Sequence, residues 1–223
     1  MDPMRKASLL VLALGFLAAC APQALTPEAR FLGAEIRGFE LSPEPALLLG
    51  VRVEFQNPNP FPLPLSTLGT RLRVGEVTVP LDLSLPPGRK EEVLLVRLTP
   101  KGALSTAQAL LSREGVEVAL EGRTLGQSLT FFHTRLAFPL EPPRVRRVGV
   151  NFFLENPNPF PLKVEGSLVL LGQSFRVQVD LPARGEGRLQ VVGFRPGLDR
   201  GTGRLELILE VPGFLRQNLV LAL

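Results

Sequence analysis

Apolar and polar residues alternate along several short stretches of the chain, which is the pattern of strands with one buried face. Apolar side chains take every second position of residues 51–55 and again of residues 150–154. The same alternation recurs in residues 77–83, 116–120, 175–181 and 205–209, and two further strands are expected at 129–138 and 214–223. With 22 Pro and 21 Gly to punctuate it, this pattern predicts an all-β protein built from short strands.

A repeated motif divides the chain into two halves. Residues 57–63 read Asn-Pro-Asn-Pro-Phe-Pro-Leu, and residues 156–162 repeat them without change. Each copy follows an alternating strand, and the later strands come in the same order in both halves. We therefore expect two tandem β-sandwiches, at residues 31–140 and 144–223, joined by a short, stiff, proline-rich spacer at 139–143.

The two halves are not identical in their predicted elements. Residues 100–114 predict one helix, with Thr99 as its cap, Pro100 at its first position and Gly115 after its end. The second half has only residues 196–203 at that place, which predict a turn. It also lacks a clear counterpart of the strand near 31–41. Either that strand is missing, or a neighbouring segment fills the edge that it leaves open for pairing.

The motif itself consists of residue types that end strands. Each Asn precedes a Pro and is held out of the helical region, while Pro has no N–H to continue a ladder. Asn side chains can replace the lost backbone hydrogen bonds, and the Phe is expected to plug the end of the core. We interpret the motif as a fold determinant, with ligand binding by exposed amides as the alternative. The residues concerned are Asn57, Pro58, Asn59, Pro60 and Phe61, and Asn156, Pro157, Asn158, Pro159 and Phe160.

A strand followed by this motif, then alternating strands and a Leu-Pro-x-Gly turn, resembles the WHy (water stress and hypersensitive response) domain of the late embryogenesis abundant type 2 family. The resemblance spans most of the chain after residue 20, in two copies. It implies an immunoglobulin-like or fibronectin-III-like β-sandwich with a short helix. It also implies a non-enzymatic role in tolerance of drying, cold or other stress, and bacterial members are often exported or lipid-anchored.

The amino terminus predicts export. Arg5 and Lys6 precede an apolar stretch at residues 8–17, which is too short to span a bilayer as a helix but fits a signal peptide. The sequence Leu-Ala-Ala-Cys at 17–20 resembles the bacterial lipobox. We expect a signal peptide at 1–19, lipidation of Cys20 and a tether at 20–30, which would anchor the protein to the cell membrane or outer membrane. An ordinary signal peptide with a chance Cys is the alternative.

The amino-acid composition excludes several kinds of functional site. A hydrophobic content of 45% argues against wholesale disorder, and a single Cys and a single His exclude a Cys/His zinc site and a disulfide framework. His133 is expected to face outward on a strand. Neither a hydrolase motif nor a phosphate-binding glycine pattern is present. We expect no enzymatic activity, no metal and no cofactor.

The net charge of +4 is spread along the chain, which does not suggest nucleic-acid binding. Its one tight basic group is Arg144, Arg146 and Arg147. We interpret this group as a solvated face, with contact to anionic lipid headgroups as the alternative.

These observations lead to one expected function and two alternatives. A lipid-anchored protein of this kind is expected to protect envelope proteins or the membrane during desiccation or other stress, through weak contacts with exposed apolar segments of client proteins. The first alternative is an assembly or adaptor lipoprotein with one dedicated envelope partner. The second is a carrier of lipid or of a small apolar ligand.

Overall fold

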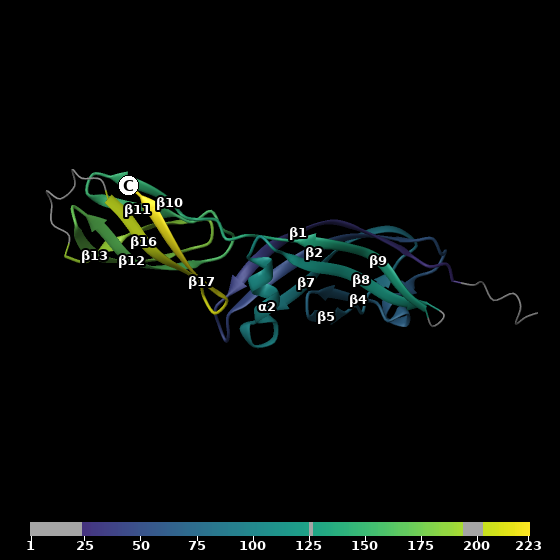
Figure 1. Cartoon of the computed structure of the whole chain (residues 1–223). Coiled ribbons are helices and arrows are strands. Elements are labelled where there is room, and N and C mark those ends of the chain that lie inside the picture. Colours follow the sequence, from purple (N-terminus) through teal and green to yellow (C-terminus); the bar gives the residue numbers. More distant parts are fainter. Residues whose placement is uncertain (1–23, 125–126, 194–202) are drawn as a thin grey trace, which may run out of the picture.

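The computed structural model of the chain describes residues 24–124, 127–193 and 203–223. Antiparallel strands dominate these residues, which confirms the predicted all-β class (Figure 1). The elements up to residue 136 are β1 (Glu28–Glu40), β2 (Ala46–Asn57), β3 (Leu63–Pro64), the 3-10 helix η1 (Leu65–Leu68), β4 (Arg71–Val74), β5 (Val77–Pro80), β6 (Ser84–Leu85), β7 (Gly88–Leu98), helix α2 (Pro100–Leu110), β8 (Val116–Thr124) and β9 (Gln127–Leu136). The later strands are β10 (Arg144–Val148), β11 (Asn151–Glu155), β12 (Leu162–Leu170), β13 (Gln173–Leu181), β14 (Glu186–Arg188), β15 (Gln190–Val191), β16 (Gly203–Val211) and β17 (Leu215–Ala222).

The first unit is a sandwich of two main sheets. One has the strand order β1-β2-β7 and the other β5-β4-β8-β9, with the short pair β3-β6 beside them. The predicted alternation holds in β2, where Val51, Val53 and Phe55 are buried and Arg52 and Gln56 are exposed. The inward residues of both sheets meet in a single apolar core.

The second unit has a long sheet and a short one. The long sheet has the order β15-β13-β12-β16-β17, and the short sheet has the order β10-β11-β14. The second unit does have a counterpart of β1: it is β10, which pairs with β11 from Arg144↔Glu155 to Val148↔Asn151. It is short because Gly149 (φ +59°) turns the chain back after five residues. The turn predicted at 196–203 lies almost wholly outside the described residues.

Helix α2 ends earlier than the sequence predicts. Leu111 is its C-cap, and its N–H donates to the carbonyl of Ala107 at 3.0 Å. The Thr99 side chain makes no capping hydrogen bond, and the backbone leaves helical geometry at Ala103 (φ −154°, ψ 30°). Because this kink rotates the next turn, the buried face contains Ala103, Thr106, Ala107 and Leu110, and Leu104 faces outward.

The segment between the units is not a free spacer. The N–H of Phe138 donates to the carbonyl of Leu110 at 2.7 Å, and that of Leu140 donates to the carbonyl of Leu111 at 3.0 Å. The second unit contributes Phe214, which is buried in the β16–β17 turn. Its ring meets that of Phe39 edge-on at 5.9 Å, and its carbonyl accepts a 2.9 Å hydrogen bond from Gln108 Nε2. The units are therefore joined end to end by specific contacts (Figure 1).

Candidate functional site

The first Asn of each motif replaces the backbone partners that the prolines cannot provide. Asn57 ends β2, and its Nδ2 donates to the carbonyl oxygens of Phe61 and Leu85, both at 2.9 Å. Its Oδ1 accepts from the backbone N–H of Asn59 at 3.0 Å and from Asn59 Nδ2 at 2.8 Å. Every hydrogen-bonding position of this buried amide thus has a partner within the motif or at Leu85, the last residue of β6.

The second Asn forms hydrogen bonds with the segment of chain that enters the sandwich. Asn59 Oδ1 accepts from the N–H of Leu25 at 2.7 Å, and Asn59 Nδ2 donates to the carbonyl of Leu25 at 2.8 Å. A side-chain amide here makes the same pair of bonds that a neighbouring strand would make. These bonds fix the backbone just before β1 begins.

The second motif repeats this arrangement around different partners. Asn156 Nδ2 donates to the carbonyls of Phe160 at 2.8 Å and Pro182 at 2.9 Å. Asn158 accepts from the N–H of Glu141 at 2.8 Å and donates to its carbonyl at 2.9 Å. We call each arrangement an asparagine clamp: Asn57 with Asn59 holding Leu25, and Asn156 with Asn158 holding Glu141.

The clamps leave no exposed amide for ligand binding. All four Asn side chains are buried, so the alternative of a binding site made of solvent-facing amides is wrong. Phe160 plugs the core completely, whereas Phe61 is only half-buried. Pro58 and Pro60 are exposed, and Pro157 and Pro159 are half-buried. The motifs lie in different units and do not form one site.

Cys20 and the signal peptide at 1–19 lie outside the described residues, as does the tether from 20 to 23. The rest of the predicted tether is described from residue 24 onward, and Glu28 already belongs to β1. The clamp on Leu25 therefore lies five positions after the predicted lipidation site.

The three clustered arginines lie on β10, where the sequence predicted no strand. Arg146 Nη2 forms an ion pair with Glu186 Oε1 at 2.6 Å, and its guanidinium lies 5.0 Å from the Phe153 ring centre. Arg147 lies 5.4 Å from the Phe152 ring centre, and its Nε donates to the carbonyl of Gly149 at 3.0 Å. Arg144 is directly opposite Glu155. All three are solvent-exposed, and Arg146 and Arg147 also make side-chain contacts within the chain.

His133 faces outward, as predicted. More than half of its side chain is exposed, and its Nε2 lies 3.6 Å from a carboxylate oxygen of Glu117. Nearby, the side-chain hydrogen bond from Arg73, with its charge and that of Arg71, lowers the pKa of the Glu121 carboxyl despite some desolvation. Within the described ranges no group of His, Cys, Asp and Glu could hold a metal ion. The same ranges contain no helix that is long and apolar enough to cross a membrane.

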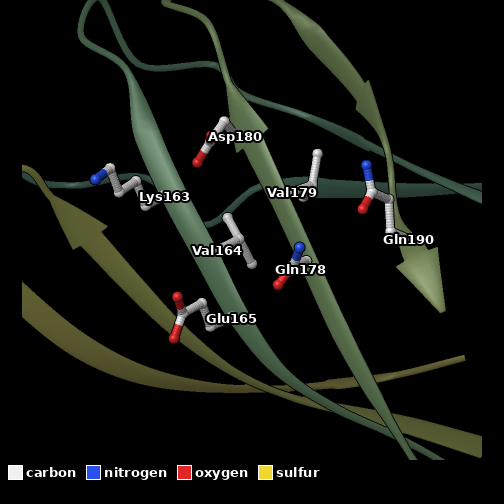
Figure 2. A pocket seen from close by; sticks show the side chains of 7 residues that line it. All are labelled: Lys163, Val164, Glu165, Gln178, Val179, Asp180 and Gln190. Carbon is white, nitrogen blue, oxygen red and sulfur yellow. The ribbon is translucent and has the colours of Figure 1, made fainter. Parts of the chain in front are cut away.

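The surface hollows of the described residues include one of about 460 Å³ beside Arg71 and Glu121, with a mixed polar and apolar lining. One of about 290 Å³ lies on the long sheet of the second unit, with Lys163 and Glu165 from β12, Asp180 from β13 and Gln190 from β15 on its walls (Figure 2). Another, of about 380 Å³, lies at the junction and includes Leu140 and Leu219. These hollows give no specific support to the carrier alternative.

An exposed edge strand was not predicted from the sequence. Among the described strands β7 pairs only with β2, so its other side offers free backbone groups. Val93 and Leu95 point outward from it, with 38% and 60% of their surfaces exposed. The alternation of residues 88–98 is visible in the sequence, but the place of this strand at a sheet edge is not.

Comparisons with known proteins do not assign this chain to a family. No protein-family model and no curated protein matches the chain. A solved structure of the YadV chaperone is similar at a TM-score of 0.27 and 14% identity, covering 77% of this chain and 92% of that one. The Salmonella enterica SafA pilin in complex with the SafB chaperone gives a TM-score of 0.26 and 13% identity, over 91% and 99% of the two chains. At such scores neither structure supports a functional argument, and the resemblance to the WHy domain stays a prediction.

Proposed function

We propose that the chain is a non-enzymatic envelope lipoprotein, anchored through Cys20, whose tandem WHy-like sandwiches protect envelope proteins or membrane during desiccation or other stress. The protection would come from weak, reversible contact with apolar segments that stress exposes in client proteins. The observation that carries this proposal is the exposed edge of β7.

The edge is suited to an extended client segment. It is 11 residues long, and a segment that pairs with it would extend the sheet through backbone hydrogen bonds, which do not depend on the client's sequence. Val93 and Leu95 lie opposite Arg52 and Gly50 of β2. Their exposed side chains offer apolar contact to alternate residues of the added segment.

Charges at both ends of β7 limit how strongly this edge can bind. Its first half contains Arg89, Lys90, Glu91 and Glu92, and near its end Arg97 is ion-paired with Glu40 at 2.9 Å. Charged residues are the usual protection of an edge strand against permanent association. The uncharged stretch from Val93 to Val96 is short, which favours brief contacts over stable complexes.

The clamp on Leu25 supports the anchored part of the proposal. Five residues can span at most about 18 Å, so a lipidated Cys20 would hold the first unit close to the membrane surface. Mass spectrometry of the amino-terminal peptide should show a lipidated Cys20. Cys20→Ala should move the protein to the soluble envelope fraction. An unmodified Cys20 would contradict the anchor but not the role of β7.

Client protection is tested with the chain beginning at residue 21, which avoids the lipid. Added to an enzyme that is unfolding thermally, it should reduce light scattering without ATP. The double variant Val93→Lys/Leu95→Lys should lose most of this effect, because two cations would be placed in the apolar stretch. Leu41→Lys is the matched control, since Leu41 is equally exposed (62%) but lies in the β1–β2 loop. No suppression at several-fold molar excess would contradict the proposal.

A crosslinking pull-down from stressed and unstressed cells separates this role from the adaptor alternative. Many partners, increasing with stress, are expected. One stoichiometric partner under both conditions would support an adaptor function instead.

A further inference from the structure

The two units point in the same direction along the molecule. In the first, the clamp lies at the end where β2 finishes and β1 begins, while Phe39, Pro45 and α2 at the opposite end meet the second unit. In the second, the clamp holds Glu141 and so lies at the junction. The molecule therefore has the Leu25 clamp at one pole and the free end of the second unit at the other (Figure 1).

Exposed apolar residues gather in the turns of that free end. Strands β10 and β12 both start at the junction and run away from it, and each ends in a two-residue turn. Val148 ends the strand before the first of these turns, Val150 is in that turn, and Leu171 is in the second, with exposed fractions of 49%, 39% and 63%. We call these three residues the distal tip.

Leu171 is held in a conformation that its side chain disfavours. Its φ is +49° and that of Gly172 is +77°, the left-handed pair of a tight hairpin turn. Asn-Gly is the favoured pair at such a turn, and a Leu there carries a steric cost. The exposed side chain gains nothing from the core in return. Such a residue at a turn tip suggests a role outside the folded chain.

Charge differs sharply between the two units. Residues 144–223 contain 11 basic and 7 acidic side chains, whereas residues 24–143 contain 12 basic and 13 acidic ones. Arg147 precedes Val148 directly, and Arg204, paired with Glu206, lies opposite Val169 near the Leu171 turn. The distal tip thus belongs to the cationic unit.

We propose that the distal tip binds the surface of an anionic lipid bilayer. Leu171, Val148 and Val150 would enter the interfacial region, while the net positive charge of this unit attracts the anionic headgroups. Apolar side chains combined with nearby basic charge are what an anionic membrane interface binds. The net positive charge of this unit favours an anionic bilayer as the partner, because binding to an apolar protein surface would not require such a charge.

The distal tip is far from the proposed lipid anchor. It lies at the pole opposite the Leu25 clamp, beyond two sandwiches whose long strands β2 and β12 span about 40 Å and 30 Å. With the lipid anchor proposed above at the other pole, the chain would bridge two facing membranes. Binding at the tip does not depend on the anchor, whereas bridging does.

Vesicle co-sedimentation tests the tip in the chain beginning at residue 21. It should bind vesicles containing phosphatidylglycerol more strongly than vesicles of phosphatidylcholine alone, and high salt should weaken the binding. Leu171→Asn should lower the affinity about tenfold, the value of one buried Leu side chain, without unfolding the chain. Leu41→Asn removes an equally exposed Leu at the junction end and should bind as the unchanged chain does.

A tethering measurement separates the tip from the anchor. The same chain, attached to neutral vesicles through an amino-terminal His tag, should cluster added phosphatidylglycerol vesicles, and Leu171→Asn should need about ten times more protein for the same clustering. Equal binding by the unchanged chain and Leu171→Asn, or no binding to anionic vesicles at low salt, would overturn the proposal. A photo-crosslinker at position 171 that captured one envelope protein, with no lipid binding, would assign the tip to a protein partner instead.

Discussion

The two sandwiches share the same asparagine clamp but differ in the length of the first two strands, which lie next to it. In the first unit β1 and β2 have 13 and 12 residues, and in the second β10 and β11 have 5 each. The clamp bonds are nevertheless the same in type, and their lengths agree closely between the copies. The clamp therefore works independently of the size of the sheet.

This independence follows from what the clamp contacts. It needs the motif, one carbonyl from a distant segment (Leu85 or Pro182) and one residue of the backbone that enters the unit, which is Leu25 in the first and Glu141 in the second. Because the bonds to that residue involve only main-chain atoms, its side chain can differ. The second unit has the smaller first sheet, so we expect it to depend more on its clamp and on its junction with the first unit.

The largest difference between the units should come from removing the first Asn. Asn156→Ala leaves the carbonyls of Phe160 and Pro182 without this donor and Asn158 without its acceptor. Such a loss costs about 3–5 kcal/mol, close to the whole stability of a small domain. Hydrogen exchange in urea should show the second unit unfolded while the first stays protected. Asn57→Ala should weaken the first unit without unfolding it, and Asn218→Ala, an exposed change, should do little. Equal effects of Asn57→Ala and Asn156→Ala would refute the difference in dependence.

Removing the second Asn should show what each clamp holds. Asn59→Ala frees the backbone of Leu25, and the amide of that residue should exchange faster while the rest of the first unit is unchanged. Asn158→Ala frees Glu141 between the units, at a cost of about 1–3 kcal/mol. It should therefore also raise exchange at Leu140 and around Phe214. If both variants change only their local amides, the second clamp has no part in joining the units.

Relieving the strain at the distal tip should stabilise the second unit. Leu171→Asn places a residue that tolerates positive φ in the hairpin turn and should add about 1 kcal/mol of stability. Thermal unfolding should show that the Tm of the second unit rises by a few degrees. Arg184→Asn, at the other described non-glycine residue with positive φ, is the control for strain alone and should also stabilise. A loss of stability in Leu171→Asn would mean that its side chain packs within the fold.

The smallest expected effect is a pH response confined to the first unit. Glu121 has a lowered pKa because of Arg73 and Arg71, so its stabilisation is present above the ordinary value of 4.5 and is lost as the pH falls through the lowered folded-state pKa. A partly exposed ion pair of this kind contributes less than about 1 kcal/mol. The free energy of unfolding of the first unit, measured between neutral and acid pH, should therefore change less with pH in Glu121→Gln than in the unchanged chain. The second unit should respond to acid as before.

The sequence by itself determined the features that depend on near neighbours along the chain. Alternation placed the buried faces of β2, β8 and β16, because side chains in a strand point to opposite sides in turn. The Asn-Pro-Asn-Pro pattern indicated a strand exit with side-chain hydrogen bonds, since proline removes the backbone donors. The repeat predicted that both units would do this in the same way.

Only the tertiary structure decided which distant backbone each clamp holds, where α2 ends and which strand lies at a sheet edge. Leu25 is 34 positions from Asn59, and the two residue types give no indication that they pair. The edge position of β7 and the gathering of Val148, Val150 and Leu171 at one pole depend on the order of strands in the sheets. That order is set by long-range packing of the whole core, which a local pattern of polar and apolar residues does not encode.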